Sequence, residues 1–144
     1  MKTRYTSLVS VKKNIMQKSE RVLQGANANL NSALVALELS FIELQNIPSP
    51  TSGQISDFLS ARTLLDSQRA IIQHNQEWTE FARNEIRNAS AQLKLDMVEY
   101  EKFNYLELEE IKGILLKRKR EEAKELDEIA LMTYKKSNIT KEIS

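Results

Sequence analysis

Apolar residues recur at intervals of seven along most of the chain, and this repeat limits the possible folds more than any other feature. The repeat comprises Val9, Met16, Leu23, Leu30, Leu37 and Leu44, and then Phe58, Leu65, Ile72, Thr79, Ile86, Leu93 and Tyr100. A sustained seven-residue repeat places one narrow stripe along a slightly supercoiled helix. Only Thr79 in it is polar, and no period-two alternation favours strands. The repeat therefore predicts two coiled-coil helices, over about residues 6–46 and 55–135.

A short segment between the two helices, residues 47–54, holds both prolines of the chain and Gly53. The prolines lack N–H groups and push the residues before them away from helical dihedral angles. Gly53 permits a positive φ, and Ser52 or Ser56 can cap the second helix. A connection of this length, about eight residues, suits neighbouring antiparallel helices. We therefore expect a turn here.

The fold class predicted is all-α, an antiparallel two-helix coiled-coil hairpin with a longer second helix. We expect one domain over residues 1–144, with a frayed tail at 136–144. A fold-back near residue 51 pairs the two halves of the repeat, and it places Leu37 near Leu65 and Leu30 near Ile72. The second helix is about twice as long as the first at 1.5 Å per residue. Residues beyond about Tyr100 are therefore expected to protrude without a partner in the chain.

Composition excludes most catalytic and nucleic-acid-binding classes. The 21 basic and 20 acidic residues nearly cancel, so no global field attracts nucleic acid or an acidic membrane. Cysteine is absent, His74 is the single histidine, and the three glycines are scattered, so the usual zinc sites, nucleophilic dyads and phosphate loops lack their residues. Glu107 and Glu110 are expected to form a solvated acidic face on an exposed helix, because catalytic carboxylates need a cleft and a two-helix rod has none. We predict no enzymatic activity, no metal and no cofactor.

Charge and hydropathy along the chain indicate a soluble, unexported protein. The most apolar stretch, residues 33–44, contains two glutamates and is too short to span a bilayer. In and after the basic run KRKR at 117–120, the pairs Lys117–Glu121, Arg118–Glu122 and Lys124–Glu128 are four residues apart and neutralise the run locally. A solvated, ion-paired helix explains this run, and an acidic protein partner is the alternative.

Surplus apolar residues flank the repeat near the turn. Leu64, Ile71 and Trp78 lie one position before the main stripe, and Leu34 and Phe41 flank the stripe of the first helix. Two helices need only a narrow stripe to pair, so these side chains are expected to be partly uncovered. His74 lies among them, as an ordinary flank of the coiled coil or as a partner contact. The cluster predicts a protein-binding surface.

Two segments resemble the flagellar FliJ family. The segment ELEEIKGILLKRKREEAKELDEIALMTY, residues 107–134, is similar to the C-terminal half of family members, including ELDEIA at Glu125–Ala130. The segment AIIQHNQEW, residues 70–78, resembles members around their second helix. Length, starting position and the break in mid-chain agree over nearly the whole chain.

The resemblance implies a non-enzymatic coiled coil of the flagellar type III export apparatus, similar in shape to the central stalk of rotary ATPases. Its open end is implied to contact the pore of a FliI-like export ATPase ring, and its turn-proximal part a FlhA-like export gate. It is also implied to escort or recycle export chaperones. Contact with the membrane is expected through the gate only, at the inner face of the cell membrane, and weak self-association is a further expectation.

Candidate partner-binding residues follow from the exposed stripes and from the resemblance. For the gate they are Leu34, Phe41, Leu64, Ala70, Ile71, His74 and Trp78, of which Ala70 and His74 come from the resemblance. For the ATPase end they are Tyr5, Leu108, Ile111, Leu115, Arg118 and Arg120. Two alternatives stay open: the stalk protein of a virulence type III system, and a self-assembling structural or chaperone coiled coil, which predicts a stable oligomer.

Overall fold

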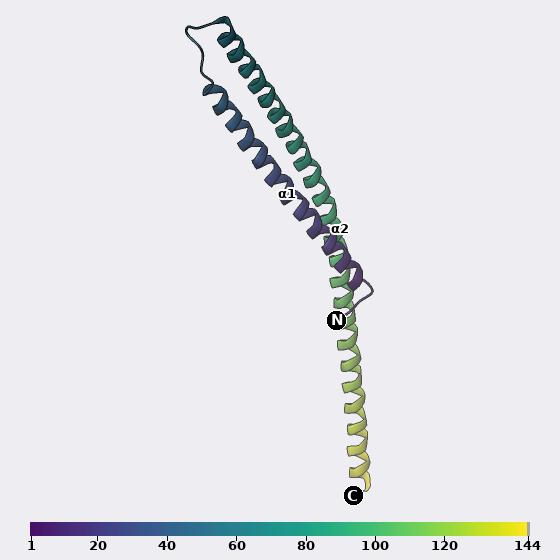
Figure 1. The fold of residues 1–144 in the computed structure, drawn as a ribbon. Helices are drawn as coiled ribbons and strands as arrows, with labels where there is room; N and C mark the ends of the chain where they lie inside the picture. The colour runs from purple at the N-terminus through teal and green to yellow at the C-terminus, as the bar shows by residue number, and fades with distance from the viewer. Residues whose placement is uncertain (144) are drawn as a thin grey trace. The chain divides into compact units, whose positions relative to one another are not determined.

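The computed structural model describes residues 1–143, with side chains to Ile139, and these residues form two helices. Helix α1 spans Thr6–Gln45 and helix α2 spans Ile55–Ile143 (Figure 1). The helices pack against each other, and no strand occurs within residues 1–143. The prediction of an all-α two-helix hairpin is confirmed.

The chain is grouped by its internal contacts into two units, and both helices contribute to each of them. One unit is Lys13–Val98, which contains most of α1, the linker and the first part of α2. The other is Met1–Lys12 together with Glu99–Ser144, whose last residue lies outside the described part of the chain. The expectation of a single domain stays a prediction.

Gly53 in the linker has the positive φ that the sequence predicts. Its φ of 142° favours glycine, and a Cβ there would stand 2.7 Å from Asp57 Oδ2. The same carboxylate accepts a hydrogen bond from the N–H of Gln54 at 3.2 Å and caps α2. The prediction of a cap by Ser52 or Ser56 is wrong, because a carboxylate in the first turn reaches back to the free N–H that precedes it.

Helix α2 continues to Ile143, past the end near Lys135 that the sequence predicts. No glycine or proline follows Gly113, so nothing in this segment stops the helix. Fraying of residues 136–144 stays a prediction, and Ser144 lies outside the described residues.

Two stripes make the contact between α1 and α2 in the unit Lys13–Val98. The predicted apolar stripe is present, with Leu30 and Leu37 half-buried and Ile72 buried. A second, more deeply buried stripe lies three residues further on in each helix, and we call it the inner stripe. Its buried members are Ala26, Ala33 and Ser40 on α1, and Gln68, Asn75, Ala82 and Ala89 on α2. The closest contact between the helices is therefore made by small and polar residues.

Polar members of the inner stripe, together with Thr79 of the apolar repeat, form a hydrogen-bonded cluster near the turn. The side-chain amide of Asn75 donates to Ser40 Oγ and to the carbonyl oxygen of Ala36, both at 3.2 Å. The amide of Gln68 donates to the carbonyl oxygen of Ser40 at 2.9 Å, and Thr79 Oγ1 donates to the carbonyl of Asn75 at 2.8 Å. These bonds offset the cost of burying the four polar side chains. Thr79, the polar exception in the apolar repeat, is thereby accounted for.

The register of the hairpin differs from the expected one. Ser40 is reached by both Gln68 and Asn75, so its level on α2 is near residue 72, whereas a fold-back at residue 51 places it near residue 62. The pairing of Leu37 with Leu65 and of Leu30 with Ile72 is therefore wrong by about ten residues, or about 15 Å. The apolar repeat cannot fix the register for two reasons. Each side chain of a coiled coil inserts between residues of the facing helix and does not lie opposite a single one, and the heptad pattern looks the same after one helix slides by seven residues.

The shifted register changes which parts of α2 lack a partner. The linker extends beyond the end of α1 before α2 begins (Figure 1). Pro48 and Pro50 favour this extended backbone. The first turn of α2 is therefore uncovered, and Ile55 and Phe58 are exposed. In the unit that contains the N-terminus, half-buried side chains continue to Ile114. The part of α2 whose described side chains are all exposed thus begins after Ile114, whereas the sequence predicts a protruding helix from near Tyr100.

Replacing Ala33 with leucine is expected to lower the free energy of unfolding by about 1–3 kcal/mol, since Ala33 is 0% exposed and a larger side chain has no room. Ala28→Leu, on an exposed face of the same helix, is the matched control and is expected to have little effect. Urea unfolding followed by circular dichroism measures both. Equal stability of the two variants would contradict the close contact at the inner stripe.

Candidate functional site

The unit Lys13–Val98 has one apolar edge, which contains part of the predicted partner surface. An open hollow on this edge is lined by Val22, Gly25 and Asn29 of α1 together with Phe81 and Glu85 of α2. Leu64, Ile71 and Trp78 precede Glu85 at intervals of seven, so they lie along the same side of α2. We define the apolar edge by Leu64, Ile71, Trp78 and Phe81 on α2, and by Val22 and Leu39 on α1.

The exposure of these side chains agrees with the expected surplus. Leu64 is 56% exposed, Ile71 is 47% exposed and Trp78 is 36% exposed, so Trp78 is not part of the core. His74 and Ala70 are also exposed. His74 falls between Ile71 and Trp78 at helical spacings and joins the apolar edge, whereas Ala70 lies on the outer face of α2.

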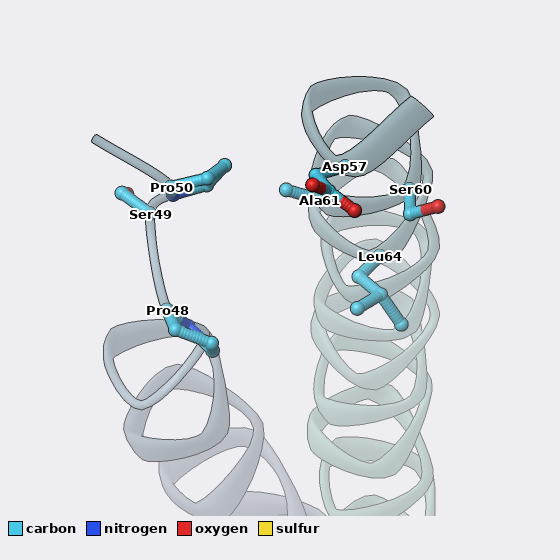
Figure 2. A pocket seen from close by; sticks show the side chains of 7 residues that line it. All are labelled: Pro48, Ser49, Pro50, Asp57, Ser60, Ala61 and Leu64. Atoms are coloured by element: carbon cyan, nitrogen blue, oxygen red, sulfur yellow. The ribbon is translucent and has the colours of Figure 1, made fainter. Parts of the chain in front are cut away.

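The apolar edge continues to the turn. Figure 2 shows Pro48 and Pro50 on the linker opposite Ala61 and Leu64 on α2, with an open hollow of about 270 Å³ between linker and helix. Asp57, which caps α2, also lines this hollow. The turn thus adds proline rings to the apolar edge at Leu64.

Leu34 and Phe41 lie on the opposite edge of the same unit. They follow the buried Ala33 and Ser40 by one position, which places them across the seam from the side that carries Val22 and Asn29. On α2 this second edge carries arginines, and we call it the charged edge. Its ion pairs are Arg69–Asp66 at 3.9 Å and Arg83–Glu80 at 3.6 Å. The turn-proximal residues predicted as one surface are therefore divided between two edges.

The N-terminal residues are held against α2 by a second polar cluster, which we call the N-terminal clasp. Thr3 Oγ1 accepts a hydrogen bond from the N–H of Tyr5 at 3.1 Å, and Thr6 Oγ1 accepts one from the N–H of Thr3 at 2.8 Å. This is the reciprocal arrangement of a helix capping box. The Thr6 hydroxyl also donates to Glu107 Oε1 at 2.7 Å. One side chain therefore caps α1 and joins it to α2.

Charged residues complete the clasp. Arg4 Nε lies 3.4 Å from Glu110 Oε2, an ion pair without the alignment of a hydrogen bond, and Arg4 stacks over the Tyr5 ring at 5.0 Å. Glu107 and Glu110 are half-buried and paired, so the prediction that they form a solvated acidic face is wrong. The reason is the shifted register, which brings the N-terminal residues level with them. Tyr5 is half-buried in the clasp and is only partly available to a partner.

The remaining residues predicted for the ATPase end lie on α2, from Leu108 between the two glutamates of the clasp to Arg120 beyond it. Leu108, Ile111, Leu115 and Arg118 follow one another at spacings of three and four, so they share one face of the helix, and Arg120 lies on another face. Ile111 is half-buried, whereas the other members of the face are exposed. Every described side chain from Leu115 to Ile139 is exposed. This part of α2 carries its apolar residues uncovered.

The residues described bring no group of three or more His, Asp and Glu side chains together as metal ligands. Over the same residues, neither helix has a stretch that is long and apolar enough to cross a membrane. The hollows on the surface are open and shallow, so the described chain offers contact surfaces rather than an enclosed site.

The family comparison agrees with these features. A family model described as the flagellar FliJ protein matches residues 1–138. The chain belongs to the FliJ family. No curated protein and no solved structure matches it. The resemblance found in the two short segments therefore extends over nearly the whole chain, and it supports a coiled-coil protein related to flagellar export, in a family that is not a known family of enzymes.

Sequence reasoning missed two features that surround these surfaces. The inner stripe is hard to recognise in the sequence because alanine and serine do not stand out in a hydropathy pattern. The clasp could have been found, since Thr3 and Thr6 have the spacing of a capping box directly before the first helix. The bonds from the clasp to α2 could not have been predicted, because they depend on the register of the hairpin.

Thr6→Val removes the hydroxyl that caps α1 and bonds to Glu107, and it is expected to cost about 1 kcal/mol of stability. Thr6→Ser keeps the hydroxyl and is the matched control. Hydrogen exchange of the amides at residues 3–10 is expected to speed up in the valine variant and to change little in the serine variant. Equal exchange in both would show that the clasp does not hold this end of α1.

Proposed function

We propose that this chain is a non-enzymatic, stalk-like component of the flagellar type III export apparatus. In this proposal it engages a FliI-like export ATPase through the exposed part of α2 and a FlhA-like export gate through the apolar edge. It acts in the cytoplasm at the inner face of the membrane, and it escorts or recycles export chaperones. The observation that carries the proposal is the exposed segment Leu115–Ile139 in a member of the FliJ family.

The composition of this segment supports a partner. An isolated helix of this length is marginal in water, and most helical stability in proteins comes from packing an apolar face. Leu126, Ile129 and Met132 are each exposed, so the segment holds apolar side chains that no described residue of the chain buries. Its alternating lysines and glutamates suit a polar surface around such a contact. A ring that surrounds the helix would supply the missing contacts.

The apolar edge supports a separate partner. Its exposed residues lie within the unit Lys13–Val98, whereas the segment proposed for the ATPase belongs to the other unit. Tryptophan is enriched among residues whose truncation weakens binding by more than about 2 kcal/mol. Trp78 is the single tryptophan of the chain, and it lies among exposed aliphatic side chains. The gate proposal is therefore centred on Trp78 rather than on Leu34 and Phe41.

Deletion of residues 117–144 is expected to abolish stimulation or assembly of the cognate export ATPase, because it removes most of the uncovered helix. The remaining hairpin is expected to keep its helical circular dichroism spectrum. Arg118→Glu tests the same surface with a single change, and Arg87→Glu, on an exposed position of the other unit, is its matched control. Unchanged ATPase activity after the deletion would exclude this role.

Trp78→Ala is expected to weaken binding to the cytoplasmic part of the gate by about tenfold or more, with a small change in melting temperature. The reason is that Trp78 is only partly covered by α1, so its truncation leaves no large cavity. Phe41→Ala, at a similarly exposed position on the charged edge, is the control and is expected to bind normally. A large fall in melting temperature with unchanged affinity of the folded protein would instead show that Trp78 stabilises the fold and does not bind the gate.

A further inference from the structure

The apolar edge is made of two unlike rows of side chains. The row on α2 is bulky, and its members are Leu64, Ile71, Trp78 and Phe81, all exposed. The row on α1 between Val22 and Leu39 is small, and its members are Gly25, Asn29, Ser32 and Ala36. A large-side-chain ridge thus runs beside a shallow channel on one face of the unit Lys13–Val98.

Neither row contains a charged residue. From Val22 to Leu39 on α1, and from Leu64 to Phe81 on α2, the positions that face this edge hold no Asp, Glu, Lys or Arg. Glu85, which lines the hollow beside Phe81, ends this uncharged stretch. The charged edge of the same unit differs, since it carries Arg62, Arg69 and Arg83 with their acidic neighbours. The cores of protein interfaces are depleted of charged residues. The apolar edge therefore has the composition of an interface core, and the charged edge does not.

The two rows are level with each other along the hairpin. Asn75 reaches the carbonyl of Ala36, so Trp78 and Phe81, which follow Asn75 on α2, lie level with the part of α1 that precedes Ala36. The hollow that contains Phe81 confirms this, because Gly25 and Asn29 form its other wall. The bulkiest exposed side chains of the edge therefore stand beside its smallest ones.

We propose that a second copy of this chain docks on the apolar edge, with a two-fold axis parallel to the helices. Such an axis places α2 of each copy over α1 of the other at the same level. Phe81 and Trp78 of one copy then enter the channel between Gly25 and Ala36 of the second copy, and the reciprocal contact forms by symmetry. The result is a bundle of four helices in which each facing pair is antiparallel.

The size of the edge agrees with a weak, reversible dimer. The stretch from Leu64 to Phe81 is about 25 Å long, and two helices side by side are about 20 Å wide. This gives about 500 Å² for each copy, or about 1,000 Å² in total, at the lower limit of specific interfaces. We therefore expect a dissociation constant on the order of micromolar or weaker. A self-complementary edge favours a second copy over an unrelated helix, because both the ridge and the channel that it fills are present on the same face.

This inference does not rest on the proposed roles in export. A second copy and the gate would use the same apolar edge, so each would exclude the other there, and the inference is tested with the purified chain alone. Sedimentation equilibrium of the full chain is expected to show a reversible monomer–dimer equilibrium. Phe81→Lys, at a side chain that is 63% exposed, is expected to weaken dimerisation at least tenfold without changing the helical spectrum. Phe41→Lys, at the 42% exposed phenylalanine of the charged edge, is the matched control and is expected to dimerise normally.

A second measurement tests the geometry. Chains that carry Ser32→Cys and chains that carry Phe81→Cys are mixed and oxidised mildly, and the mixed disulfide dimer is expected to exceed the disulfide dimer of Ser32→Cys with itself. A chain that stays monomeric to high concentration would overturn the proposal and leave the edge to a different protein. Equal weakening by Phe81→Lys and Phe41→Lys, or an excess of the Ser32→Cys self-dimer, would also overturn it.

Discussion

The contact at the inner stripe is the constraint on which the rest of the structure depends. Ala26 and Ala33 on α1, with Ala82 and Ala89 on α2, are buried where the helices meet, and small side chains at a contact allow helix axes to approach closely. The larger residues of the apolar repeat lie on one side of this contact and the residues of the apolar edge on the other, and both sets are left partly uncovered. A narrow seam of this kind leaves apolar surface on the edges, so the apolar edge is a direct consequence of the small inner stripe.

Polar residues decide which register the seam adopts. Alanines seven residues apart are equivalent when one helix slides by a heptad, and they do not distinguish registers by themselves. The bonds of Ser40 to Gln68 and Asn75 near the turn, and the bond from Ser19 to Asp96 nearer the other end of the unit, are satisfied together in one register. A slide of seven residues would leave buried amide groups without partners, which costs more than the hydrogen bonds contribute. Buried polar residues are well suited to this role in coiled coils.

The helices, their antiparallel arrangement and the position of the turn could be predicted from the sequence, because these features depend on local patterns of leucine, proline and glycine. The register could not be predicted, since Leu37 matches the repeat at Leu65 as well as it matches repeat positions further along α2. The errors that followed have this single origin: the unpaired helix was expected from Tyr100, and Glu107 was expected in solvent. For the candidate sites, the exposure of Leu64, Ile71 and Trp78 was predictable from their offset from the repeat. The separation of Leu34 and Phe41 from them requires knowledge of which two helix sides form each edge.

The scarcity of large buried side chains has a consequence for how the protein responds to temperature. Within the described residues, no large side chain is fully buried, and the buried apolar residues are four alanines and Ile72. The heat capacity change of unfolding grows with the apolar surface that becomes exposed, and a small change flattens the curve of stability against temperature. A hairpin with this seam is therefore expected to have modest stability that varies little between cold and warm conditions.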